Sequence, residues 1–188
     1  MLTKDSSKFA HLCVPARVTG PKSYNPEARK SKIFFAKAKD YPTTFNILQS
    51  CIIQEYPHIY RYIDYSKITD IQYVKYNNGD FFKLHHDVIN VPKNCDVRIL
   101  SMSVNLTDQQ KYEGGDLVVY NNKHKHKILT TLERERGSFV IFPSFFYHEV
   151  TKVTKGQREA IVTWLNDSEL CYQEFRRNLT QRFKTLDR

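Results

Sequence analysis

Two imidazoles and a carboxylate that could bind a metal ion stand close together in the run Leu84-His85-His86-Asp87. Alternate side chains of a β-strand point to the same face, so His85 and Asp87 would share a face while His86, the rival ligand, points to the other. The third ligand must come from elsewhere, and the best candidate is His148, which follows a predicted strand in an aromatic-rich segment. Two histidines and one carboxylate leave positions open at which Fe(II) can bind a bidentate cosubstrate and O₂, whereas zinc usually takes a closed or nearly closed tetrahedral set.

The His-x-Asp triplet by itself is a weak signal, because so short a motif recurs by chance. A longer frame surrounds it. In chain order its parts are Tyr76-x-x-Gly79-x-x-Phe82-x-x-His85-x-Asp87, Tyr112-Glu113-Gly114-Gly115-Asp116-Leu117, Gly137-x-x-x-x-Phe142-Pro143, His148-x-Val150-x-x-Val153-x-x-Gly156-x-Arg158 and Trp164. At these residues the chain resembles the prolyl 4-hydroxylase-like branch of the 2-oxoglutarate/Fe(II) dioxygenases, over about residues 68 to 167.

The resemblance implies a role for each matched polar residue. His85, Asp87 and His148 would hold the iron, and no catalytic residue beyond these metal ligands would be needed. Arg158, ten residues after His148, would bind the distal carboxylate of 2-oxoglutarate, a task that suits the planar fork of donors on a guanidinium. Tyr76 occupies the position of the tyrosine that reaches toward the cosubstrate in this family, and packing in the core would also explain it.

Further residues are candidates for contacts inside the site. Ser101, Ser103 and Asn105 alternate along one predicted strand and should share a face. Ser103 and Asn105 are therefore assigned to cosubstrate binding, although many members of the family carry an aromatic or other group there. Trp164, six residues after Arg158, looks like the family's aromatic residue near the substrate mouth, and burial in the core would explain it equally well.

The elements that must position these residues are mostly strands. Short runs rich in Val, Ile, Phe and Tyr alternate with turn signals such as Asn77-Asn78-Gly79, which is typical of a sandwich, jelly roll or barrel. The expected strands cover residues 32–36, 71–76, 81–84, 100–106, 117–120, 127–132, 138–142 and 160–165. A helix should begin at Thr43 or Thr44 and end before Pro57, and the tail after Asp167 should also be helical.

The fold class that follows is mainly β with flanking helices (α+β). The resemblance implies a double-stranded β-helix core of the jelly-roll or cupin type, which agrees with the independent strand count. We expect residues 1–67 to supply extended segments and a supporting helix within the same domain. Residues 68–167 should form the catalytic core, and residues 168–188 a C-terminal helix.

The resemblance also indicates a reaction. It implies an Fe(II)- and 2-oxoglutarate-dependent dioxygenase that hydroxylates a C–H bond, with O₂ as cosubstrate, succinate and CO₂ as co-products and ascorbate as an activator. The first interpretation of the substrate is a prolyl or related residue in a polypeptide. Alternatives are a nucleic-acid base, a free amino acid or another small metabolite, and last a binding module without catalysis. Base oxygenases tend to carry a second arginine about six residues after the first, and here that position is Trp164.

The composition says more about the binding partners and cellular environment of the protein than about its reaction. A formal net charge of +9 favours acidic partners, nucleic acid among them, but a generally solvated basic surface would give the same value. The four cysteines are widely spaced and suggest neither a zinc site nor a disulfide scaffold. No signal peptide or apolar run long enough for a membrane span is found, so we expect a soluble, cytoplasmic protein.

Overall fold

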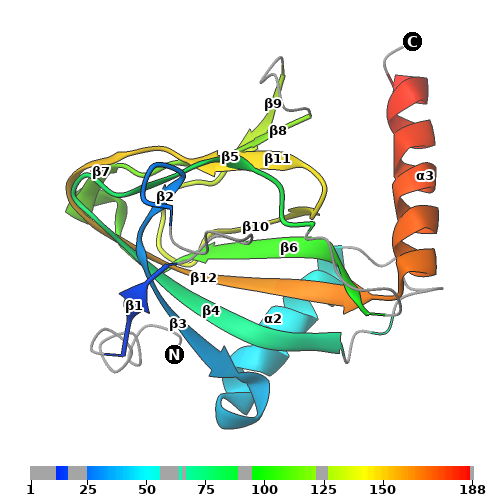
Figure 1. The fold of residues 1–188 in the computed structure, drawn as a ribbon, viewed down its shortest axis with the longest axis horizontal. Coiled ribbons are helices and arrows are strands. Elements are labelled where there is room, and N and C mark those ends of the chain that lie inside the picture. The colour runs from blue at the N-terminus through cyan, green and yellow to red at the C-terminus, as the bar shows by residue number, and fades with distance from the viewer. Residues whose placement is uncertain are drawn as a thin grey trace.

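Two antiparallel sheets face each other, with helices against the larger one (Figure 1). The computed structural model describes residues 12–16, 25–55, 64, 67–88, 95–121 and 127–186. Within these residues the larger sheet has the strand order β1-β3-β4-β12-β6-β10, and β7 pairs with β12 off this path. Its strands are β1 (Val14–Pro15), β3 (Lys32–Lys37), β4 (Ile68–Asn77), β6 (Val97–Asn105), β7 (Tyr112–Gly114), β10 (Phe139–Pro143) and β12 (Val153–Asp167).

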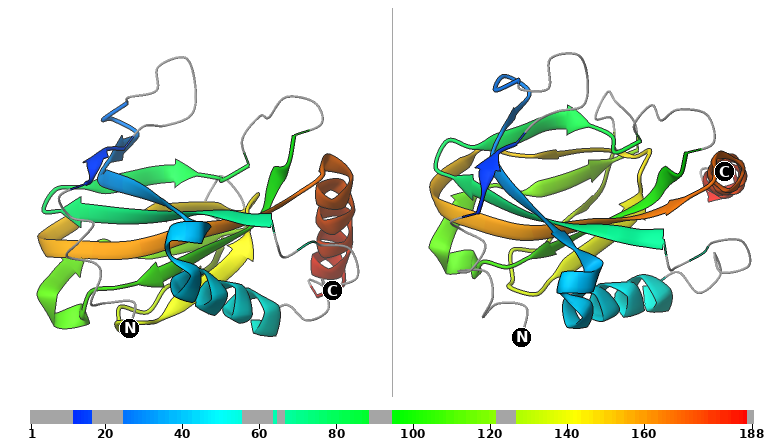
Figure 2. Two further views of the ribbon diagram at one scale, coloured as in Figure 1. Left: turned by 90° about the horizontal axis from the view of Figure 1, so that it is seen from below. Right: turned by 60° about the horizontal axis from the view of Figure 1, so that its bottom comes forward.

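The smaller sheet has the order β2-β5-β11-β8-β9. Its strands are β2 (Arg29–Lys30), β5 (Phe81–His85), β8 (Leu117–Tyr120), β9 (Ile128–Thr131) and β11 (Tyr147–Val150). The helices are α2 (Pro42–Glu55) and α3 (Glu169–Leu186), with short 3₁₀ turns η1 (Ala38–Asp40) and η3 (Gln109–Lys111). In Figure 2, α3 stands where β12 ends, and α2 crosses beside the larger sheet.

The larger sheet buries side chains on both of its faces. Strand alternation sends Val74 and Ala160 into a cluster that the smaller sheet completes with Val119 of β8 and Val150 of β11. Neighbouring residues in the same strands turn the other way, toward a second cluster. That cluster includes Tyr73 and Ile161 of the sheet, Leu48 and Ile52 of α2, and Tyr172 of α3. The gap between the two sheets therefore has apolar walls, and α2 and α3 brace the sheet that carries the longest strand.

Most of the expected elements are confirmed. The helix predicted to begin at Thr43 or Thr44 begins at Pro42, the tail after Asp167 is helical, and a strand overlaps each predicted run to within one residue at either end or extends beyond it. The sequence did not reveal the short strands β1, β2, β7 and β11, because runs of two to four residues carry too little periodicity. Among the described residues, no helix combines the length and the apolar character needed to cross a membrane.

Gly156 lies at a turn within β12 where the backbone passes close to η3. Its φ is +73°, and a Cβ at this position would meet the carbonyl oxygen of Lys111 at 2.1 Å. Gly137 also has a positive φ, +94°, but a Cβ there would have no neighbour within 4 Å. An alanine would therefore be strained by the positive φ at either position, but only at Gly156 would its Cβ also clash with the backbone.

We expect Gly156→Ala to destabilise the fold much more than Gly137→Ala. The left-handed backbone should cost each variant about 1 kcal/mol, and the clash should raise the loss at Gly156 to more than about 2 kcal/mol. Urea unfolding followed by circular dichroism measures both. Equal losses in the two variants would show that β12 shifts freely at this turn.

Candidate active site

The register between β5 and β11 brings two histidines together. His85 and His148 are direct cross-strand partners, and their ring centroids lie 4.1 Å apart. Asp87 follows His85 by two residues, but β5 ends at His85, so strand alternation alone does not place this carboxylate. Its backbone N–H instead donates to the carbonyl of Ser144 at 2.8 Å. His86 is exposed, and its ring packs against Tyr147, outside the group.

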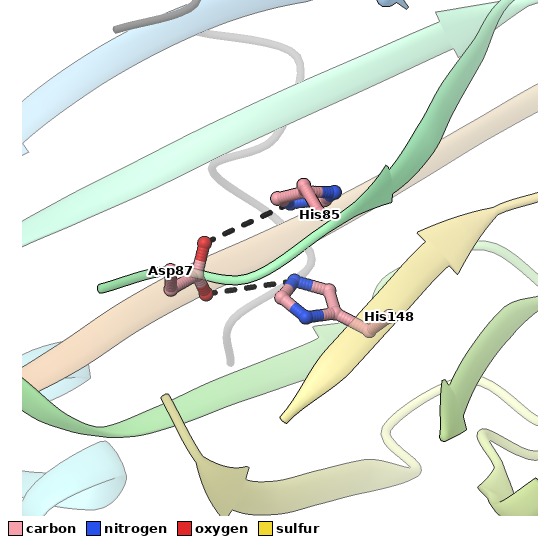
Figure 3. A group of neighbouring side chains, drawn as sticks. All are labelled: His85, Asp87 and His148. Carbon is pink, nitrogen blue, oxygen red and sulfur yellow. Dashed lines mark ion pairs between the residues drawn. The ribbon is translucent and has the colours of Figure 1, made fainter. Parts of the chain in front are cut away.

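His85, Asp87 and His148 converge on one point between the sheets (Figure 3). Nε2 of His85 lies 3.7 Å from Oδ1 of Asp87, and Nε2 of His148 lies 3.6 Å from Oδ2. The ligand atoms of all three residues lie within 4.8 Å of one another. Two imidazoles and one carboxylate at this spacing fit an octahedral ion that keeps other positions open, which is the donor set of non-haem Fe(II).

Backbone carbonyls orient both imidazoles. Nδ1 of His85 lies 2.8 Å from the carbonyl oxygen of Lys83, and Nδ1 of His148 lies 3.1 Å from that of Phe146. A proton on each Nδ1 satisfies these contacts and leaves the lone pair of each Nε2 directed at the shared point. The same tautomer therefore serves the fold and a metal ion.

Two donors from the larger sheet hold the carboxylate of Asp87. Ser101 Oγ donates to Oδ2 at 2.7 Å, and Trp164 Nε1 donates to the same oxygen at 2.9 Å. Ser101 and Trp164 are cross-strand partners in β6 and β12, so the register of the sheet places both donors side by side. Ser144 Oγ lies 2.9 Å from Ser101 Oγ and completes the chain of hydroxyls. Oδ1 remains available for a metal ion.

The surroundings of His85 and Asp87 keep these two ligands in the forms that bind metal. Burial lowers the pKa of His85 to about 3, helped by the charge of His148 and opposed by Asp87, so this imidazole is neutral at pH 7. Burial alone would raise the pKa of Asp87. His148, His85, Arg98 and the hydrogen bond from Trp164 together hold that pKa well below its usual range. Neutral imidazole and ionised carboxylate are the ligand forms of a metal site.

A cavity of about 640 Å³ opens beside the three ligands. Arg158 on β12 lines it and is only 2% exposed. Among the described residues this guanidinium has no carboxylate or hydrogen-bond partner, and it faces the ring of Tyr76, whose centroid lies 5.8 Å from Cζ. An unpaired buried guanidinium is costly unless a ligand supplies the anion. The cavity therefore offers a site for a carboxylate next to the metal ligands.

The remaining expected site residues fall in different places. Tyr76 is the cross-strand partner of Arg158, and both Tyr76 and Ser103 line the cavity. Asn105 is fully buried, and its amide donates to the carbonyls of Thr107 and Arg134, so it ties β6 to neighbouring loops. Its side chain is not among those that line the cavity.

Trp164 was expected at the substrate mouth, and the structure gives it a second task. It lines the cavity and is 6% exposed, but its indole N–H is committed to Asp87. The sequence offered no signal for this contact or for the matching one from Ser101, because both depend on how the two sheets pack. Burial of an indole commonly requires such an acceptor, which is the one general hint available.

We expect Trp164→Phe and Ser101→Ala each to weaken Fe(II) binding about tenfold, since donors that orient a metal ligand typically contribute that much. Anaerobic Fe(II) titration measures the affinity. Ser50→Ala is the matched control, because Ser50 on α2 bonds only the backbone of its own helix at Asn46. Unaltered Fe(II) affinity in both site variants would show that Asp87 needs no support from the larger sheet.

Comparison with known proteins now identifies the group to which this chain belongs. The model of the 2OG-Fe(II) oxygenase superfamily matches residues 71–166, which is just over half of the chain. The chain belongs to this superfamily. The match spans His85, Asp87, His148, Arg158 and Trp164, so the candidate site lies wholly inside it.

Curated relatives of this chain include PKHD-type hydroxylases. One from Alteromonas mediterranea is 34% identical over 111 residues, which cover 57% of this chain and 47% of the relative. One from Escherichia coli is 35% identical over 94 residues, 48% of this chain and 40% of the relative. The chain thus spans about half the length of the curated relatives it matches.

Solved structures of prolyl hydroxylases share the fold of this chain. A prolyl-4-hydroxylase from Pseudomonas putida superimposes with a TM-score of 0.66 at 19% identity, covering 88% of this chain and 84% of that one. A prolyl hydroxylase from Trichoplax adhaerens, in complex with a hypoxia inducible factor peptide fragment, gives 0.66 at 19%, covering 90% and 78%. The expected double-stranded β-helix core, mainly β with flanking helices, is confirmed.

Proposed function

We propose that this oxygenase uses Fe(II), 2-oxoglutarate and O₂ to hydroxylate a C–H bond, most readily that of a prolyl or related residue in a polypeptide. The observation that carries the proposal is the pairing of two features in one cavity. His85, Asp87 and His148 present a metal-ligand set, and Arg158 presents an unpaired, buried guanidinium beside it. A metal chelator that also carries a distant carboxylate satisfies both, and 2-oxoglutarate is such a molecule.

In this proposal the chain's own residues bind and orient. His85, Asp87 and His148 hold the iron, Ser101 and Trp164 fix the direction of Asp87, and Arg158 binds the distal carboxylate, with Tyr76 and Ser103 beside it. When bound, iron and 2-oxoglutarate supply the chemistry, in which one oxygen atom of O₂ enters the substrate and the other enters succinate as CO₂ leaves. No side chain is required to transfer a proton, and apolar residues such as Phe142 and Val150 limit the entry of water.

A polypeptide substrate is favoured by the proteins that this chain resembles. Its curated relatives are named hydroxylases, and both of the solved structures compared above are prolyl hydroxylases, one of them with a peptide bound. The cavity extends past the metal ligands to Val14 and Phe35, which are exposed apolar side chains at its rim. An extended peptide could lie across such a rim with one residue inserted toward the metal.

The experiment that tests the proposal compares substrate classes in one assay. The protein, loaded with Fe(II) and ascorbate, should convert 2-oxoglutarate into succinate slowly by itself and faster with proline-containing peptides. Oligonucleotides and free amino acids serve as the other arms. The absence of both succinate formation and 2-oxoglutarate binding under every condition would overturn the enzyme assignment. Stimulation by oligonucleotides alone would indicate that the substrate is a nucleic-acid base and not a polypeptide.

A further inference from the structure

Two more guanidiniums line the cavity that holds the metal ligands and Arg158. They belong to Arg29 on β2 and Arg98 on β6, and the ammonium of Lys83 stands at the exposed rim. Among the described lining residues the only carboxylate is that of Asp87. Neither arginine forms an ion pair with a described acidic residue. Arg29 is buried and Arg98 half-buried, and such an excess of positive charge away from solvent is unfavourable unless a ligand neutralises it.

Arg29 is 8% exposed and is held in a fixed orientation. Its Nε donates to Ser31 Oγ at 2.9 Å, and one Nη donates to Gln72 Oε1 at 3.0 Å. The guanidinium also lies 4.4 Å from the ring centroid of Phe82, which in turn stacks on His85 at 3.5 Å. Both partners in hydrogen bonding are neutral, so the charge is positioned without being neutralised, and other N–H groups of the fork remain for a ligand.

The guanidinium of Arg98 lies over the indole ring of Trp164. Its Cζ is 3.7 Å from the ring centroid of Trp164, whose indole N–H donates to Asp87. Burial lowers the pKa of Arg98, and the nearby charge of Arg29 lowers it further. The charges of Asp87 and Asp70 oppose this shift. A stacked guanidinium keeps its in-plane donors free, because the contact uses only its face. The two arginines thus stand on aromatic rings that touch two different metal ligands.

When the charges of the site with iron and 2-oxoglutarate bound are added up, those of Arg29 and Arg98 are not part of the balance. Under the proposed function, the two charges of Fe(II) and the one of Arg158 balance Asp87 and the two carboxylates of 2-oxoglutarate. Arg29 and Arg98 then have no carboxylate left to pair with among the described residues that line the cavity, and the charge of Asp70, which acts on Arg98, comes from outside that lining. Two oriented forks of donors suit a planar carboxylate, which accepts paired hydrogen bonds from a guanidinium.

We propose that Arg29 and Arg98 bind a carboxylate of the primary substrate, so that the hydroxylated residue adjoins an acidic group of the polypeptide. This inference rests on the proposed function and adds to it the chemical class of the sequence that is recognised. The acidic group can be the side chain of a neighbouring Asp or Glu or the C-terminal carboxylate of the peptide. Both sources offer the same planar anion at one residue's distance from the reacting carbon.

The test is a binding measurement that needs no turnover. Trp164 is the single tryptophan of the chain and contacts Arg98, so its fluorescence should report occupancy of the cavity. The protein is loaded with Mn(II) and 2-oxoglutarate without O₂ and titrated with acetylated, amidated Ala-Glu-Pro-Glu-Ala or its Gln counterpart. Acetyl-Ala-Ala-Pro with a free or amidated C-terminus separates the second source of the carboxylate. A thymidine dinucleotide tests a phosphate instead.

We expect the acidic member of at least one pair to bind about tenfold more tightly than its neutral counterpart, the usual size of a charge-assisted hydrogen bond. Arg29→Gln and Arg98→Gln should each reduce that ratio, and the double variant should bring it near one. Because the ratio compares two peptides on the same protein, a general loss of stability leaves it interpretable. Arg177→Gln on the exposed face of α3 makes the same chemical change away from the cavity and should keep the full ratio.

Three results would overturn the inference. They are equal binding of acidic and neutral peptides to the unmodified protein, a preference that survives in the double variant, and tight binding of the dinucleotide alone. A failure of the proposed function looks different, since 2-oxoglutarate itself would then neither bind nor yield succinate. The inference can therefore fail while the oxygenase assignment stands.

Discussion

Asp87→Asn should remove most of the iron affinity of this protein, with the dissociation constant for Fe(II) rising about 100-fold or more and succinate formation falling to background. The substitution keeps the shape of the side chain and its acceptor for Ser101 and Trp164. It removes the negative charge that offsets a divalent ion between two neutral imidazoles. Loss of an outer donor typically costs 10- to 100-fold in affinity, so about 100-fold is the least expected for the anionic ligand itself.

The control for this variant is Asp40→Asn, which makes the same change at an exposed position in η1. Anaerobic titration with Fe(II), or with Co(II) followed by its visible absorption, gives both affinities. Asp40→Asn should match the unmodified protein. If Asp87→Asn does so too, the ligand set is wrong, and His86 becomes the next residue to replace.

Arg158→Gln should raise the concentration of 2-oxoglutarate needed for half-maximal turnover by about 30-fold or more, while Fe(II) affinity stays the same. A buried charge-assisted pair with a carboxylate contributes about 2 to 3 kcal/mol, which corresponds to that factor. We expect Fe(II) affinity to stay the same because, among the described residues, Arg158 faces Tyr76 and has no hydrogen bond or ion pair with His85, Asp87 or His148. The variant therefore distinguishes cosubstrate binding from metal binding.

Arg177→Gln again serves as the matched control, because that arginine is exposed on α3. Steady-state succinate formation at increasing 2-oxoglutarate gives the half-saturation constant, and Arg158→Lys tests whether charge alone suffices. Lysine should restore part of the affinity, since it keeps the charge and loses the planar fork. A half-saturation constant that does not move in Arg158→Gln would place the distal carboxylate elsewhere.

The basic net charge has a more local meaning than the composition suggested. A charge of +9 could have reflected nucleic-acid binding or ordinary solvation. Arg29, Arg98 and Arg158 show that part of it lies inside the cavity, two of the three stacked on aromatic rings. Arg29 and Arg98 were not assigned to the site from the sequence, because an arginine outside the motif carries no local signal.

The sequence predicted most of the secondary structure because the strands are short, apolar and separated by Gly and Asn turns. Strand spacing, together with the resemblance to 2-oxoglutarate/Fe(II) dioxygenases, also singled out His85, Asp87, His148 and Arg158. The strand-alternation argument that preferred His85 over His86 applies to His85, because this residue is the last of β5 and is the cross-strand partner of His148 on β11. Strand alternation does not reach Asp87, because β5 ends two residues before it, and a backbone hydrogen bond to Ser144 positions this residue instead.

What the sequence by itself determined is the kind of chemistry: residue types and intervals that match a metal site and a carboxylate-binding arginine. Only the tertiary structure decided how those groups act together. The β5–β11 register sets His85 against His148, and the packing of one sheet on the other carries Ser101 and Trp164 to Asp87. The physical reason is that the spacing of residues within a strand determines which face of the sheet each side chain points to. Which residues meet across the two sheets depends instead on long-range strand pairing, which no local sequence pattern encodes.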